Sequence, residues 1–104
     1  MPTESTMILV EIIRAIPRGK VASYGGIAEI AGVPGGPAGA RQVVRVLSSM
    51  TKQYDLPWWR VVKKDGRIAL SEGNGRDQQI QLLEAEGVAF IEPGRVDMRS
   101  SGLR

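Results

Sequence analysis

Apolar residues recur along the first third of the chain at spacings that predict two helices. The first helical face is formed by Ile8, Leu9, Ile12, Ile13 and Ile16. This spacing predicts a helix over about residues 6–16, which Pro17 stops. Ser23 is placed to cap a second, shorter helix over residues 24–31, and Gly32 is placed to end it.

A third helix is predicted over about residues 38–50, after the breaker-rich segment 34–39. Its apolar face is formed by Val43, Val46, Leu47 and Met50, and its polar face carries Arg41, Gln42, Arg45 and Ser49. Two short helices joined by a glycine-containing turn, the second with arginines on its open face, are typical of a helix-turn-helix. A plain helical hairpin fits the same pattern.

The second half of the chain predicts a basic hairpin, a fourth helix and a short strand pair. The runs 58–62 and 67–70 flank Lys63-Lys64-Asp65-Gly66, where Asp-Gly is a frequent hairpin turn. A basic hairpin beside a helix-turn-helix predicts a small, mainly helical α/β domain of the winged helix-turn-helix class, with a short β-hairpin wing. Beyond it we expect a helix over 76–86 ended by Gly87, and a strand over 88–91 that pairs with 95–98.

Length and composition narrow the possible functions. A chain of 104 residues predicts one domain over 1–104, with a core over about 6–91 and a flexible tail over 98–104. The chain contains no cysteine and no histidine, which excludes disulfides, thiol nucleophiles, imidazole bases and zinc sites that need sulfur or imidazole ligands. Because it shows neither a signal peptide nor an 18-residue apolar run, we expect a cytoplasmic protein without membrane contact.

Charge is distributed unevenly along the chain. Residues 12–71 carry ten Lys and Arg against three Asp and Glu, a net +7, whereas the remainder carries −4. A basic segment of this kind is typical of a nucleic-acid-binding face, although a solvated surface accounts for it equally well. The eleven carboxylates are scattered without metal-ligand spacing, so neither a metal nor another cofactor is expected.

Adjacent tryptophans at 58 and 59 are the least usual feature of the sequence. In a strand, neighbouring side chains face opposite sides, so only one indole can enter the core and the other must line a cleft or lie under a loop. An aromatic side chain near basic residues is also how proteins stack an unpaired base.

Four ordered blocks of the sequence resemble one known family. They read Ile16-Pro17-x-Gly19-x-Val21-x-Ser23-Tyr24-Gly25-x-Ile27-Ala28, Ala40-Arg41-x-Val43, Pro57-Trp58-Trp59-Arg60-Val61-Val62-x-x-x-Gly66 and Leu82-Leu83-x-x-Glu86-Gly87. This pattern, which spans about residues 7–91, resembles the C-terminal domain of O6-alkylguanine-DNA alkyltransferase. Those enzymes carry Pro-Cys-His-Arg-Val in the third block, so Trp58 stands at the cysteine position and Trp59 at the histidine position. This replacement is similar to that of the alkyltransferase-like proteins.

The resemblance implies a non-enzymatic sensor of O6-alkylguanine in double-stranded DNA. It implies that Tyr24 crowds the phosphate beside the lesion, that Arg41 replaces the extruded base, and that Trp58 borders the alkyl group. Since an indole is no thiolate-class nucleophile, the alkyl group cannot be transferred. Glu86, at the relay position of the enzymes, is then a structural residue that bonds the indole or a nearby backbone amide.

The resemblance and the basic segment together give a set of candidate DNA-binding residues. Lesion and DNA contacts are expected from Tyr24, Gly39, Ala40, Arg41, Gln42, Arg45, Trp58, Arg60, Val61 and Ser71, and wing contacts to phosphate from Lys63 and Lys64. Ser71 replaces a tyrosine that commonly closes the pocket in the enzymes, which predicts room for larger alkyl groups. Gln42, Val44 and Arg45 are larger than the family's usual residues on the recognition helix, so that part of the helix either adds a phosphate contact or lies further from the groove.

Two other functions are compatible with parts of the sequence. A winged-helix transcription regulator explains the charge pattern but not the tryptophan pair. A residual hydrolase would have to use Glu86 or Asp65, and no spacing supports it. The family further implies recruitment of nucleotide excision repair proteins to the bound lesion, and a single lesion favours a monomer, associated with the nucleoid when bound to DNA.

Overall fold

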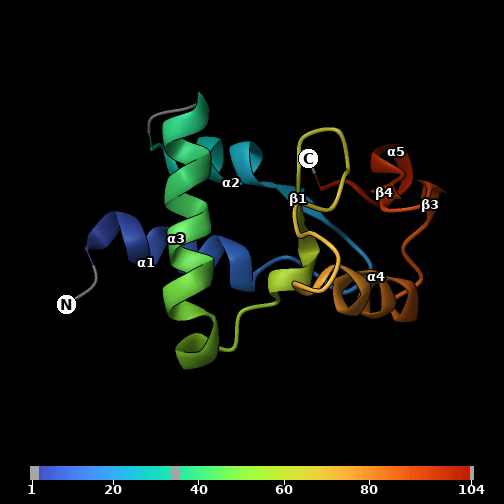
Figure 1. The fold of residues 1–104 in the computed structure, drawn as a ribbon. Helices are drawn as coiled ribbons and strands as arrows, with labels where there is room; N and C mark the ends of the chain where they lie inside the picture. The colour runs from blue at the N-terminus through green and yellow to red at the C-terminus, as the bar shows by residue number, and fades with distance from the viewer. Residues whose placement is uncertain (1–2, 34–35, 104) are drawn as a thin grey trace.

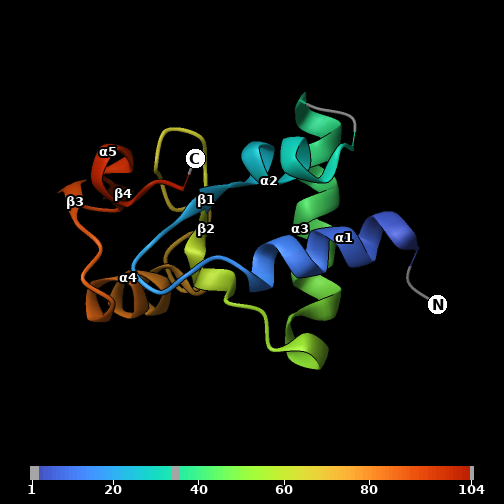
Figure 2. The ribbon, with the colours of Figure 1, turned by 180° about the vertical axis from the view of Figure 1, so that it is seen from behind.

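A computed structural model describes residues 3–33 and 36–103 and arranges them in two packed halves joined by a small parallel sheet. Helices α1 (Glu4–Arg14), α2 (Tyr24–Ala31) and α3 (Gly36–Tyr54) form one half. The other half contains α4 (Arg76–Ala85), the hairpin of β3 (Phe90–Glu92) and β4 (Arg95–Val96), and the short helix α5 (Met98–Ser101). Figures 1 and 2 show the two halves on opposite sides of the strand β1 (Ala22–Ser23).

Strand β1 pairs in parallel with β2 (Val61–Val62), in the register Ala22 with Val61 and Ser23 with Val62. Successive residues of these segments face opposite sides, as strand geometry requires. Ala22 and Val61 therefore pack into the cluster formed by α1, α2 and α3, whereas Val62 packs into the cluster around α4. The two strands thus form the wall that both hydrophobic clusters share.

Local capping sets the bounds of α1 and α2. The Ser23 hydroxyl accepts a hydrogen bond from the Gly26 amide, and Gly32 ends α2 in the left-handed conformation, as predicted. Helix α1 begins earlier than predicted because Thr3 serves as its N-cap, and it ends at Arg14 with Ala15 as its C-cap, two residues before the predicted end at Ile16. Ile16 nevertheless remains buried.

Helix α3 is longer than the predicted 38–50. It continues through Tyr54, because neither glycine nor proline follows Met50, and it ends where Asp55 adopts a positive φ of 52°. Pro34 and Gly35 of the predicted breaker segment lie outside the described residues. The fourth helix agrees with its prediction, since α4 spans Arg76–Ala85 and Gly87 follows with a φ of 81°.

The predicted class, a small and mostly helical domain with a small β-hairpin, is confirmed, but the hairpin lies at β3–β4. The run predicted as a strand over 58–62 begins instead with one 3-10 turn, η1 (Trp58–Arg60). At the predicted wing, the Gly66 amide donates to the Lys63 carbonyl and closes the turn. The Lys63 amide donates to the Arg67 carbonyl across the turn, but residues 67–70 form no strand beyond this bond, and Arg67 also forms an isolated bridge with Arg95. The predicted wing is therefore a basic loop supported by β4.

Residues 98–103, predicted as a flexible tail, form a short helix and backbone hydrogen bonds to the rest of the fold. Asp97 caps α5, and Ser101 is 5% exposed. The Val21 amide donates to the Ser101 carbonyl and the Leu103 amide donates to the Val21 carbonyl. These bonds attach the end of the chain to the segment that precedes β1. Arg104 lies outside the described residues.

Candidate functional site

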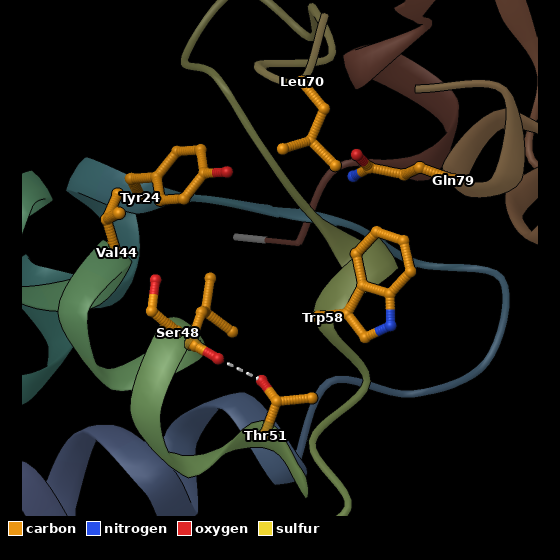
Figure 3. A pocket seen from close by; sticks show the side chains of 8 residues that line it. Tyr24, Val44, Ser48, Thr51, Trp58, Leu70 and Gln79 are labelled. Atoms are coloured by element: carbon orange, nitrogen blue, oxygen red, sulfur yellow. Dashed lines mark hydrogen bonds between the residues drawn. The ribbon is translucent and has the colours of Figure 1, made fainter. Parts of the chain in front are cut away.

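A cavity of about 220 Å³ opens between the helix-turn-helix and the other half of the molecule, and we call it the Trp58 pocket. It is lined by Tyr24, Val44, Leu47, Ser48, Thr51, Trp58, Leu70 and Gln79. Figure 3 shows the Tyr24 ring and the Trp58 indole on opposite sides of the space, with Ser48 and Thr51 contributed by α3. A mostly apolar wall with a few polar groups is typical of a site for a flat organic ligand.

The two adjacent tryptophans have different surroundings. Their ring planes are perpendicular, with centroids 6.1 Å apart, because η1 turns the backbone between them. Trp58 lines the pocket, whereas Trp59 packs against the cluster around α4. The prediction that one indole lines a cleft and the other lies in packed surroundings is confirmed, although through a 3-10 turn in place of a strand.

Behind the pocket, Glu86 accepts hydrogen bonds from three segments of the chain. Its carboxylate receives the Trp59 Nε1 proton at 2.8 Å, the Gly19 amide at 2.9 Å and the Arg60 guanidinium at 2.7–3.2 Å. Arg60 also donates to the Ile16 carbonyl. Glu86 therefore holds the tryptophan turn against the loop that precedes β1, and the predicted structural role, through the indole and a backbone amide, is confirmed.

The charge state of Glu86 follows from these contacts. Burial by itself would raise the pKa of the carboxyl group, but the hydrogen bonds from Arg60, Gly19 and Trp59 outweigh burial and lower the pKa from 4.5 to about 2. The side chains of Arg60 and Glu86 are only 15% and 4% exposed. The pair is therefore a buried structural ion pair near neutral pH.

A second, larger cavity of about 440 Å³ lies beside the first, and we call it the basic cleft. Its lining comes from the starts of α2 and α3, including Gly25 and Ala40, and from Lys63 and Lys64 of the basic loop. Tyr24 lines both cavities, and its partial burial raises the pKa of the phenol, so the hydroxyl stays protonated. Tyr24 thus stands where a polyanion in the cleft and a flat group in the pocket would meet.

The structure brings some of the predicted residues to these cavities. Tyr24 and Trp58 line the pocket, while Ala40, Lys63 and Lys64 line the cleft. On α3, Arg41 and Arg45 are exposed, Gln42 is half-buried and Gly39 is buried. The arginines are therefore available on the open face of the second helix of the helix-turn-helix.

Three predicted contact residues have other surroundings. Arg60 is predicted to contact DNA, but its guanidinium is bound to Glu86 and to the Ile16 carbonyl. The Val61 side chain is fully buried in the core, and its carbonyl accepts a hydrogen bond from Gln79. Ser71 is exposed and its hydroxyl accepts from Asn74, while the neighbouring Leu70 lines the pocket in the place expected for Ser71.

Gln79 is one of the pocket residues that the sequence analysis did not predict. It is 2% exposed, and its Nε2 donates to the Trp59 carbonyl at 3.0 Å and to the Val61 carbonyl at 3.1 Å. Its signal in the sequence is a glutamine one helical turn before Leu83, on the buried face of α4. The other unpredicted lining residues, Leu47, Ser48, Thr51 and Leu70, carry no comparable signal.

Within residues 3–33 and 36–103, no three His, Cys, Asp or Glu side chains gather in a way that could hold a metal ion. None of the helices in those ranges has the length and apolar character needed to cross a membrane.

Comparisons with known proteins agree with this geometry. The family described as "6-O-methylguanine DNA methyltransferase, DNA binding domain" matches residues 5–88. A DNA base-flipping protein of Vibrio parahaemolyticus is 43% identical over 88 residues, which are 85% of this chain and 84% of that protein. Alkyltransferase-like protein 1 of Schizosaccharomyces pombe is 38% identical over 78 residues, which are 74% of this chain and 69% of that protein.

Solved structures extend the likeness to the whole fold. The crystal structure of S. pombe Atl1 in complex with damaged DNA containing O6-carboxymethylguanine superposes with a TM-score of 0.81 at 27% identity, covering 100% of this chain and 99% of that one. Mycobacterium tuberculosis O6-methylguanine methyltransferase gives a TM-score of 0.63 at 28% identity, over 83% of this chain and 50% of that one. Together with the tryptophan pair, these matches show that the chain belongs to the alkylguanine alkyltransferase family, through its DNA-binding domain, and resembles the alkyltransferase-like proteins within it.

Proposed function

We propose that this chain binds O6-alkylguanine in double-stranded DNA, rotates the modified nucleotide into the Trp58 pocket and holds it there without transferring the alkyl group. The observation that carries the proposal is Trp58 itself. An indole stands where the family's enzymes have a cysteine, and it forms a wall of a cavity beside a helix-turn-helix. The names of the relatives, a base-flipping protein and a protein crystallised with damaged DNA, support the same function.

The contact surface suggests how DNA would lie on the protein. Helix α3 enters the minor groove with the small residue Ala40, which lines the basic cleft, facing the DNA, whereas Gly39 is buried beside it. Arg41 enters the base stack and occupies the space that the rotated base leaves. Arg45 and Gln42, further along α3, contact the neighbouring backbone. Lys63 and Lys64, which line the basic cleft, neutralise phosphates and make binding sensitive to salt.

Tyr24 couples the cleft to the pocket. A phosphate drawn toward the lysines is crowded by the phenol, which favours rotation of the attached nucleotide toward Trp58. Extruding a base costs a few kcal/mol, less where the base pairs poorly, so an alkylated guanine is favoured before it touches the pocket. The indole then supplies an apolar surface for the alkyl group.

The chain has no group that could accept the alkyl carbon in the way the family's enzymes do. Cysteine and histidine are absent from the sequence, and the carboxylate nearest to Trp59 is held by Arg60. Binding without reaction serves repair only if other proteins act on the lesion. We therefore propose that a bound monomer marks the lesion for nucleotide excision repair proteins, in the cytoplasm and on the nucleoid.

The first test is fluorescence anisotropy with a labelled duplex that carries one O6-methylguanine, compared with its unmodified twin at one stated salt concentration. Intact-protein mass is then measured after incubation. Selective binding with an unchanged protein mass supports the proposal. Equal binding to both duplexes would overturn the proposal and favour a winged-helix regulator. A mass increase of one methyl group would show that the protein does accept the alkyl group.

A further inference from the structure

A third cavity lies apart from the Trp58 pocket and the basic cleft, and we call it the Arg14 pocket. Its volume is about 260 Å³, and its lining comes from the ends of α1 and α3 and from η1, which Figures 1 and 2 show close together. The lining residues are Arg14, Tyr54, Asp55, Pro57, Trp59 and Arg60. Among the described residues, none that lines this cavity also lines either of the other two, so the Arg14 pocket is a separate site.

The walls of the Arg14 pocket are largely aromatic. Tyr54 and Trp59 are half-buried. The Trp59 Nε1 proton is already donated to Glu86, so the rest of this indole offers only hydrocarbon to a ligand. The Arg60 guanidinium lies over the same indole, 5.3 Å from the ring centroid. Tryptophan, tyrosine and arginine are the residue types that contribute most to binding between proteins, and this pocket gathers four of them.

The two arginines of the pocket have hydrogen-bond donors to spare. Arg60 donates from Nε and Nη2 to Glu86 and from Nη1 to the Ile16 carbonyl. Since a guanidinium has five N–H groups, each terminal nitrogen keeps one N–H without a partner in residues 3–33 and 36–103. In the same ranges, the one ion pair of Arg14 is an exposed contact with Glu11 at 3.5 Å, which contributes little.

Burial decides which of the charged groups gains most from a ligand. The Arg60 side chain is only 15% exposed, so water reaches its remaining donors poorly and an acceptor that reaches them is favoured. Asp55, the acid of the lining, is exposed, so water hydrates its carboxylate and screens its charge. The pocket therefore favours a ligand that accepts hydrogen bonds over one that donates them, and a planar carboxylate matches guanidinium donors best.

The surroundings of the pocket favour a peptide carboxylate over the phosphates of a nucleic acid. A nucleic acid would bring a row of negative charges past the exposed carboxylates of Asp55 and Glu11, which repel it. A peptide brings one carboxylate with neutral neighbours, whose apolar atoms can cover Tyr54 and Trp59. We propose that the Arg14 pocket binds an acidic side chain in a segment of a protein partner. This inference goes beyond the proposed function, and it does not depend on binding of the lesion.

The test uses a small probe of this chemistry, N-acetyl-glutamyl-leucinamide, titrated into ¹⁵N-labelled protein. The indole N–H resonance of Trp59 and the Nε–H resonance of Arg60 report on the Arg14 pocket, while the indole N–H of Trp58 reports on the other cavity. We expect saturable shifts of the first two resonances and an unchanged Trp58 resonance. The glutaminyl analogue, which differs only in the carboxylate, should cause no saturable shift.

Three variants test the assignment of the charges. Arg14→Gln should weaken binding of the glutamyl probe by about fivefold, the upper value for a partly exposed charge pair. Asp55→Asn should strengthen binding by roughly twofold, because it removes an opposing acid, and asparagine tolerates the left-handed conformation of residue 55. Lys52→Gln makes the same charge change as Arg14→Gln at an exposed position of α3 outside the lining, and it should leave binding nearly unchanged.

Several outcomes would overturn the proposal. Equal shifts with the glutaminyl analogue, no saturable shift with either probe, or equal weakening by Lys52→Gln and Arg14→Gln would show that no carboxylate site is present. Acetate that binds as tightly as the glutamyl probe would assign the pocket to a free ion, and inorganic phosphate that does so would assign it to a phosphate ligand. Displacement of the probe by the O6-methylguanine duplex would assign the pocket to the DNA-binding surface. If Arg14→Gln does not fold, as judged by circular dichroism, the comparison of the two probes and the opposite effect of Asp55→Asn still decide.

Discussion

Replacing Glu86 by glutamine tests the network that holds the tryptophan turn. Glu86→Gln keeps the shape of the side chain but removes the charge that balances Arg60. The glutamine oxygen can still accept from Gly19 or Trp59, but its NH₂ group is directed at donors and the Arg60 guanidinium loses its counterion. We expect the variant to fold with a marked loss of stability at pH 7.

Two independent magnitudes agree on the size of this loss. Lowering the pKa of Glu86 from 4.5 to about 2 corresponds to about 3 kcal/mol of favourable interaction with the charged carboxylate. Breaking one side of a buried ion pair costs about 3–5 kcal/mol, and the partial exposure of Arg60 favours the lower end. A domain of this length has a total stability of roughly 10 kcal/mol, so the loss is a large fraction of it.

The pH dependence distinguishes this cause from a packing defect. Because the folded-state pKa of Glu86 lies below its unfolded value, the stabilisation is fully present above about pH 4.5 and is lost as the pH falls toward 2. Urea unfolding should show the unsubstituted chain about 3 kcal/mol more stable than Glu86→Gln at pH 7 and the two nearly equal at pH 2. Glu84→Gln, an exposed position on the same helix, should change stability by less than about 0.5 kcal/mol. A difference that stays constant between pH 7 and pH 2 would refute the electrostatic explanation.

Further predictions concern DNA binding and the basic loop. Arg41→Ala should weaken lesion binding by about 1–3 kcal/mol in anisotropy titrations, and an unchanged preference for the lesion would show that another residue fills the stack. Lys63→Ala should weaken binding to modified and unmodified duplexes equally and reduce the slope of log affinity against log salt concentration by about 1. An unchanged slope would show that Lys63 does not contact a phosphate. Trp58→Cys should give little or no methyl transfer in a mass assay, because no histidine is present to activate the thiol, and rapid transfer would contradict this reasoning. Gly66→Ala should lower the free energy of unfolding in urea by more than Gly73→Ala, for which we expect a loss of roughly 1–2 kcal/mol. Both glycines have a positive φ, but only at Gly66 does the new methyl group meet a backbone carbonyl of β4, so equal losses would contradict this reasoning.

Sequence reasoning was most accurate where a few neighbouring residues decide the structure. The bounds of α2 follow from Ser23 and Gly32, and the end of α4 follows from Gly87, because capping bonds join residues only a few positions apart. The absence of cysteine and histidine is equally a property of the sequence alone. Errors arose where local signals compete, as at η1, where a β-like run of aromatic and branched residues begins with a turn.

Tertiary structure decided the contacts between distant segments. Gly19 and Glu86, 67 residues apart, are joined by a hydrogen bond, and β1 finds its partner in β2 instead of a neighbouring hairpin. No periodicity predicts such pairs, since they depend on how the two halves pack. The same packing pairs Arg60 with Glu86 and places Gln79 in the wall of the Trp58 pocket. The sequence thus determined the helices and the absence of cysteine. The folded chain decided which polar groups remain free to meet a ligand, because a buried polar group forms hydrogen bonds with the groups packed beside it.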